Sequence, residues 1–198
     1  MKKKLTTKMM RYPVLITSMS AFVMLLMFFM PYASAKGERR EYLIKYADSM
    51  YMKEIGMTYA DAVHISLFEY VRMYAEAINQ DMHKVISIVC LVLIGIFAGF
   101  TLLTLLMALL KKPIGIIIFD LLALGAFRIV CFDFQDRGVV PNSSYSCGIA
   151  GYMVYATGVV VLAGAIWLFV EKRKAKKLAK MEQKSVIQEQ MVSDENSN

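Results

Sequence analysis

The sequence predicts an all-α integral membrane protein: a bundle of four transmembrane helices, with a helical hairpin outside the membrane between the first two. Of the 198 residues, 58% are hydrophobic and 20% are charged, whereas soluble domains have roughly 45–50% apolar and 25% charged residues. The apolar residues gather into runs of about the 20 residues that a membrane-spanning helix needs. The basic residues gather beside these runs, where they orient helices and meet anionic lipid.

Four segments satisfy the length criterion for a span. The third contains the charged residues Asp120 and Arg128, whereas the others have no charge apart from Lys84 at the start of the second. We predict the spans at residues 12–35, 84–110, 113–132 and 149–170.

The distribution of Lys and Arg predicts the orientation, because basic residues mark the cytoplasmic side. Residues 1–11 carry five basic residues, the 111–112 connection two and the tail, 171–198, seven. Acidic and basic residues nearly balance in 36–83 and 133–148, which we therefore expect outside. The prediction is a multi-pass protein of the plasma membrane with both termini in the cytoplasm.

The net charge of +7 does not indicate nucleic-acid binding, because the basic residues flank the spans and no aromatic platform for bases accompanies them. Five of them form a cluster directly after the fourth span. We expect this cluster to bind anionic lipid headgroups at the cytoplasmic face; it consists of Lys172, Arg173, Lys174, Lys176 and Lys177.

The first apolar run has two possible fates. Ala33-Ser34-Ala35, preceded by Pro31, fits a signal peptidase site. The apolar run of residues 14–30 is longer than the roughly 7–15 residues of a signal-peptide core, however, which favours a retained span. Cleavage would leave three spans with the same orientation.

The segment 36–83 is predicted as two helices. Apolar residues from Leu43 to Tyr51 and from Val63 to Ile78 recur at helical spacing. Gly56 can end the first helix, and Thr58 can cap the second, which would run directly into the second span. Tyr70 and Tyr74 on the second helix either pack against the first helix or form a partner-binding face.

Small and polar residues within the spans suggest where helices meet. Gly95 and Gly99 share one face of the second span, and Gly151, Gly158 and Ala165 share one face of the fourth, so both faces permit close helix packing. Asp120 lies about 10 Å into the third span. It is either a proton or cation site or a hydrogen-bonding group facing the bundle, while Arg128 can reach the headgroups.

Two cysteines bracket the second outer loop. Cys131 and Cys147 would face an oxidising compartment, so we predict a disulfide between them. The sequence contains no paired catalytic carboxylates, nucleophile motif or metal-ligand spacing, and His64 and His83 form a poor metal site. We therefore expect neither an enzyme nor a cofactor.

Three short motifs resemble the uncharacterised four-span membrane proteins of Gram-positive bacteria. These are Met30-Pro31-Tyr32-Ala33-Ser34, Ile65-Ser66-Leu67-Phe68-Glu69 and Cys147-Gly148-Ile149-Ala150-Gly151-Tyr152. The topology is also similar to that of claudins and tetraspan proteins, but the claudin signature is absent, since Trp167 is the sole tryptophan. The resemblance implies a helical bundle and brings no activity or site residues.

The function that these features predict is that of a non-enzymatic membrane scaffold or accessory subunit. Its outer hairpin would bind a partner, either another membrane protein or a second copy of this chain. The alternative is a small transporter or channel component that uses Asp120.

Overall fold

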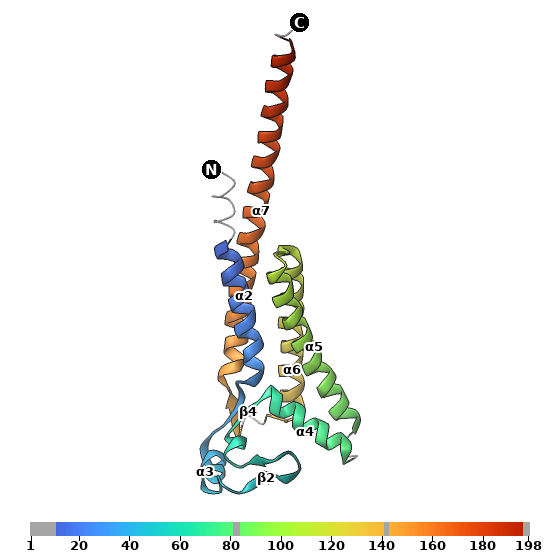
Figure 1. The fold of residues 1–198 in the computed structure, drawn as a ribbon. Helices are drawn as coiled ribbons and strands as arrows, with labels where there is room; N and C mark the ends of the chain where they lie inside the picture. The colour runs from blue at the N-terminus through green and yellow to red at the C-terminus, as the bar shows by residue number, and fades with distance from the viewer. Residues whose placement is uncertain (1–10, 81–83, 141–142, 196–198) are drawn as a thin grey trace.

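The computed structural model describes residues 11–80, 84–140 and 143–195. It has four helices that are long and apolar enough to cross a membrane, as predicted. They form an elongated bundle with the start of the first helix and the C-terminal part of the last one at one end (the tail end) and a small mixed α/β layer at the other (Figure 1). The helices are α2 (Arg11–Leu26), extended by the 3-10 turn η1 (Met27–Phe29), α5 (Lys84–Leu109), α6 (Pro113–Asp136) and α7 (Ile149–Glu195).

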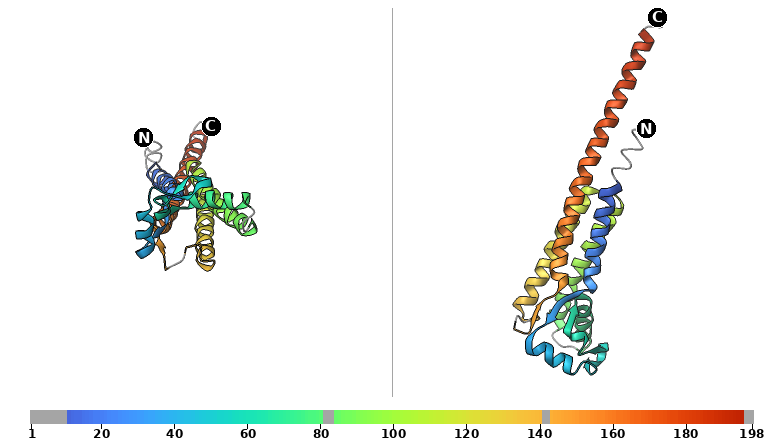
Figure 2. Two further views of the ribbon diagram at one scale, coloured as in Figure 1. Left: turned by 90° about the horizontal axis from the view of Figure 1, so that it is seen from below. Right: turned by 90° about the vertical axis from the view of Figure 1, so that its left-hand side faces the viewer.

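The helices pack as a ring in the order in which they occur in the chain. The first helix, α2, lies against α7 and α5, and α6 lies between α5 and α7; two further views show the same arrangement (Figure 2). A tight turn joins α5 to α6, with Lys111 in the left-handed region at φ 56°. Pro113 begins α6, where its fixed φ suits the first helical position.

Small residues allow close helix approach at particular points. A Cβ on Gly158 would lie 2.7 Å from a methyl carbon of Leu124, and one on Gly164 would lie 2.4 Å from the Thr17 hydroxyl. Ala165 is fully buried. Gly95 and Gly99 have no atom within 4 Å of such a Cβ, so this pair faces outward from the bundle, where it makes no contact between helices of the same chain.

The layer at the other end of the bundle, which we call the cap, comprises residues 31–80 together with strand β5. Its centre is a three-stranded antiparallel sheet in the order β4-β1-β5. Strands β2 and β3 form a separate hairpin. The cap elements are β1 (Pro31–Ala35), α3 (Gly37–Lys45), β2 (Met50–Met52), η2 (Lys53–Ile55), β3 (Met57–Thr58), η3 (Asp61–Val63), β4 (His64–Ser66), α4 (Leu67–Asn79) and β5 (Tyr145–Cys147).

The cap therefore replaces the helical hairpin that the periodicity predicted. Gly56 does adopt the left-handed conformation, at φ 63°, but it follows the short turn of the β2–β3 hairpin. Thr58 does pair with Asp61, but these bonds span residues 58–61 ahead of the 3-10 turn η3 and cap no α-helix. Residues 64–66 are extended because they hydrogen-bond to β1, a partner distant in sequence, and such tertiary pairing overrides local propensity.

The boundaries of the predicted spans also shift. The first helix ends at Phe29, and residues 31–35 form the central strand of the cap sheet, with Ala33 fully buried. The second cap helix starts at a capping box formed by Ser66 and Glu69. It ends at Asn79 and lies across the end of α5 as a separate helix (Figure 1), so it does not continue into the span.

Candidate functional site

One cavity, which we call the main cavity, lies between the cap and the bundle and has a volume of about 820 Å³. Its walls come from α3, β2, β4, α4, the first turn of α5, the end of α6 and the segment before β5. The side chains that line it are Arg39, Tyr51, Met52, Ile65, Tyr70, Met73, Tyr74, Ala77, Ile86, Ser87, Arg137, Val139, Ser144 and Tyr145. This size is within the range of small-molecule binding sites.

One wall of the cavity presents Arg39, which projects from the first turn of α3. Its Nη2 donates to the Tyr51 hydroxyl at 3.4 Å, and a hydrogen bond with Tyr145 raises the pKa of the guanidinium above its ordinary value. Among the described residues no carboxylate pairs with Arg39. It is thus a cation held in place by neutral tyrosines.

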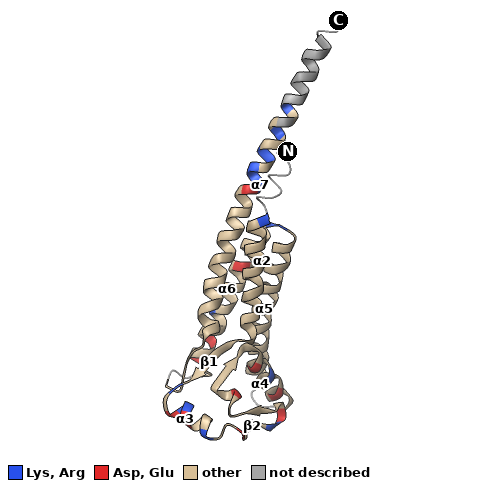
Figure 3. Ribbon diagram, turned by 60° about the vertical axis from the view of Figure 1, so that its left-hand side comes forward, with Lys and Arg blue, Asp and Glu red and all other residues tan. Residues whose placement is uncertain are grey.

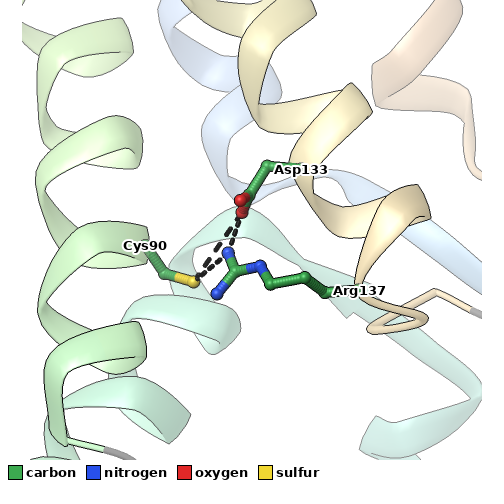
Figure 4. A network of polar contacts seen from close by, with 3 residues as sticks. All are labelled: Cys90, Asp133 and Arg137. Atoms are coloured by element: carbon green, nitrogen blue, oxygen red, sulfur yellow. Dashed lines mark hydrogen bonds and ion pairs between the residues drawn. The ribbon is translucent and has the colours of Figure 1, made fainter.

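A second cation, Arg137, faces the cavity from the end of α6. Its Nη2 donates to Asp133 one turn earlier and to the Cys90 thiol of α5 at 2.8 Å (Figure 4). Its Nε is buried and has no hydrogen-bond partner. Burial, and then a hydrogen bond with Cys90, raise the pKa of Tyr74. The network therefore joins α4, α5 and α6 beneath the cavity.

Tyr70 and Tyr74, the predicted partner-binding pair, belong to an aromatic cluster at the junction of cap and bundle. Tyr70 is 4% exposed, and its ring lies 4.9 Å from that of Phe134, 6.2 Å from Tyr32 and 6.3 Å from Tyr74, centroid to centroid. Burial raises the pKa of Tyr70. The two rings therefore pack against Phe134 of α6 and, for Tyr70, Tyr32 of β1, and not against the first cap helix as in the predicted hairpin.

The exposed tyrosines of the cap lie elsewhere, on α3 and the loops beside it. Tyr42 and Tyr46 are 46% and 42% exposed, and their rings lie 5.0 Å apart and within 6.2 Å of the Tyr59 ring. Arg39 lies 5.9 Å from the Tyr42 ring centroid. We call these three rings, together with two exposed apolar residues near them in the sequence, the tyrosine surface; its members are Tyr42, Ile44, Tyr46, Met50 and Tyr59.

Asp120 faces the interior of the bundle. It is fully buried, and neither carboxylate oxygen has a hydrogen-bond partner. Thr101 and Thr104 of α5 are also buried, and their hydroxyls donate to carbonyls of their own helix. Arg128 is exposed on the outside of α6, beside Tyr155.

The predicted disulfide between Cys131 and Cys147 is wrong. All three cysteines are free. Cys131 lies within α6, whereas Cys147 is held by the pairing of β5 with β1, opposite Ala33. The ring of Tyr32 packs against Phe127 and Phe134 of α6, and its hydroxyl bonds to Cys131. The Cys147 thiol donates instead to the Gly148 carbonyl and lies 2.3 Å from where a Cβ on Gly151 would be.

The predicted lipid-binding cluster lies along α7 at the tail end, where Lys and Arg positions follow one another along the ribbon (Figure 3). Lys174 pairs with Glu171 at 3.3 Å, and Arg173 lies 4.6 Å from the Phe169 ring centroid. Lys172 donates to the carbonyl of Lys111. A second cavity of about 530 Å³ lies here, lined by Lys112, Pro113, Ile114, Gly115, Phe169, Lys172, Arg173 and Lys176.

The main cavity was not predictable from the sequence, because its walls come from seven segments. The separation of Asp133 and Arg137 by four residues is a helix-pairing signal, but nothing local marks Arg39 or Tyr145 as facing the same space. Among the described residues there is no group of three His, Cys, Asp or Glu side chains that could hold a metal ion. No protein-family model, curated protein or solved structure matches this chain.

Proposed function

We propose that this protein is a non-enzymatic scaffold or accessory subunit of the plasma membrane, and that its cap binds a partner protein on the outer side. The observation that supports the partner is the tyrosine surface. Tyr, Met and Arg are enriched where proteins bind one another, and rigid aromatic rings provide contact area at small entropic cost. Tyr42 and Tyr46 remain exposed although other cap tyrosines are buried.

The proposed orientation rests on charge. Basic residues of α7 and the α5–α6 turn mark the tail end (Figure 3), which supports a cytoplasmic location for both termini. Reporter domains fused after Lys112 and after Lys184 should both give cytoplasmic signals, and one inserted after Asp48 should give an outer signal. Any reversal among the three would contradict this topology.

The first span is proposed to stay in the protein. Ala33 lies in the central strand of the cap sheet, and Thr17, Ala21 and Met24 are buried in the bundle. Cleavage after Ala35 would remove this strand and leave both neighbouring strands without their hydrogen-bond partner. Intact-mass analysis of the membrane-extracted protein tests this point, and a mature chain beginning at Lys36 would refute it.

The partner is expected to be an integral membrane protein or a second copy of this chain. The outward-facing pair Gly95 and Gly99 leaves room for a helix from outside the bundle. Crosslinking in native membranes, followed by purification in mild detergent, should yield one partner in stoichiometric amount.

The decisive variant is Tyr42→Ser/Tyr46→Ser, which removes the exposed rings. It should lose the partner and keep the wild-type melting temperature, because exposed substitutions change stability little. The matched control is Lys36→Ser/Glu41→Ser, which alters two exposed residues, one directly before α3 and one within it. This control should keep the partner. Retention by the tyrosine variant, or no stoichiometric partner in wild type, would contradict the proposal.

A second candidate function, proton or cation transport, follows from Asp120. Both oxygens of this fully buried carboxyl group lack a partner, and intramembrane ionisable residues commonly mark ion pathways. Purified protein in liposomes would show flux that Asp120→Asn abolishes and that the exposed control Asp136→Asn preserves. Absence of flux in wild type, or flux that survives Asp120→Asn, would exclude this role.

A further inference from the structure

The position of the main cavity limits what it can hold. Ile86 and Ser87, in the first turn of α5, form part of its wall. Ile86 is exposed, and α5 is one of the helices that can cross a membrane. The cavity therefore reaches the protein surface at the level where the span begins. In a bilayer this is the level of the lipid headgroups.

The charges around the cavity are of one sign. Arg39 of α3 and Arg137 at the end of α6 both line it, and no acidic side chain does. Asp133 lies behind Arg137 and holds its Nη2, which orients the guanidinium. The buried Nε of Arg137 has no acceptor, and a buried donor without a partner is costly unless a ligand supplies one. The cavity is thus suited to an anionic group.

The remaining walls are apolar or neutral. Met52, Ile65, Met73, Ala77 and Val139 provide the apolar surface, and methionine side chains adapt to flexible ligands. Burial raises the pKa of Tyr70 and Tyr74, so these phenols carry no negative charge at neutral pH. A ligand that matches both features has an anionic head and an apolar body.

We propose that this cavity binds an anionic phospholipid of the outer leaflet, with its phosphate between Arg39 and Arg137 and its glycerol and upper acyl region against the methionine side chains. The leaflet follows from the orientation proposed above, but the lipid chemistry does not depend on the partner-binding role. A free phosphate ion would leave most of about 820 Å³ and all of the apolar wall unused. A lipid occupies both parts of the site.

The test is a titration of the purified full chain with phosphatidylglycerol, followed by native mass spectrometry, with phosphatidylcholine as the reference lipid. Arg39→Gln should weaken binding of phosphatidylglycerol about tenfold or more, the loss expected for a hydrogen bond to a charged group. Arg40→Gln, which changes the same charge on an exposed neighbour outside the cavity, should bind as wild type. The basic cluster of α7 is identical in all variants, so its background binding is the same.

Two further measurements separate the alternatives. Ala77→Trp fills the cavity without changing its charge, and it should weaken binding of phosphatidylglycerol to a similar extent. It is also the variant to use if Arg39→Gln proves unstable. Inorganic phosphate alone should not raise the melting temperature or compete with the lipid. Equal binding by Arg39→Gln and Arg40→Gln, unchanged binding by Ala77→Trp, or effective competition by phosphate would each overturn the proposal. If Ala77→Trp loses lipid binding but still retains the partner, the lipid site is distinct from the tyrosine surface.

Discussion

The bundle and the cap bury their side chains by different means. In the bundle, apolar residues cover every side of each helix, and those that face outward remain exposed without penalty in a bilayer, such as Val85, Val159 and Ile129. In the cap, burial requires strands distant in sequence to pair, and polar residues close the turns. Composition therefore suffices to predict the bundle, whereas the cap depends on specific long-range contacts. The cap should accordingly be the more sensitive region to single substitutions.

The largest effect is expected where the two regions meet. Tyr70→Ala would remove a ring that packs against Phe134 and Tyr32, and large-to-small core substitutions of this kind cost about 3–5 kcal/mol. Trp167→Ala, at a half-exposed site on α7, should cost much less. Reversible unfolding in detergent would compare the two, and equal losses would show that the junction is no more tightly packed than the lipid-facing surface.

Two glycines, one at the cap and one in the bundle, give a second comparison of the two regions. A Cβ on Gly148 would lie 2.1 Å from the backbone oxygen of Pro31, whereas one on Gly95 would meet nothing within 4 Å. Gly148→Ala must displace backbone in the cap and should cost about 2–3 kcal/mol. Gly95→Ala should be neutral or slightly stabilising, since alanine favours helix. Melting temperatures of the two variants check this, and a tolerated Gly148→Ala would mean that β1 and the start of α7 are not in contact.

The junction should also be sensitive to alkaline pH. Burial raises the pKa of Tyr70 and Tyr74 above the ordinary value, so above pH about 10 the unfolded chain loses protons that the folded chain keeps. Stability then falls as pH rises, by up to about 1.4 kcal/mol per pH unit for each tyrosine. Tyr70→Phe should reduce this slope, whereas Tyr42→Phe on the exposed surface should not. Equal slopes of stability against pH for wild type and both variants would contradict the buried position of the Tyr70 hydroxyl.

The smallest effect tests how a cap helix begins. The Ser66 hydroxyl accepts from the Glu69 amide, and the Glu69 carboxylate accepts from the Ser66 amide. Ser66→Ala should cost about 1 kcal/mol, and Ser49→Ala, at an exposed loop position, should cost almost nothing. Hydrogen exchange should rise in the first turn of α4 and stay unchanged in the bundle. Exchange that increases in α5 or α6 as well would show that cap and bundle unfold as one unit.

Particular residues show how far prediction from the sequence extends. The positions of Pro113, Gly158 and Ala165 follow from their known roles at helix starts and close helix contacts, and the structure uses them in this way. Tyr70 and Tyr46 both belong to apolar stripes of helical spacing, yet Tyr70 is buried at the junction and Tyr46 is exposed. The cysteines were misjudged because spacing measures distance along the chain, whereas β5 pairing and the Tyr32 ring determine their positions in space.

The sequence by itself determined four apolar helices and the concentration of basic charge at one end, because hydrophobic length and charge are additive properties of a chain. The tertiary structure decided that residues 31–35 become a central strand, that Gly95 and Gly99 face outward, and that Arg39 and Arg137 border one cavity. These features depend on pairing between segments far apart in the chain. Such pairing is set by the combined packing of cap and bundle, and no local pattern encodes it.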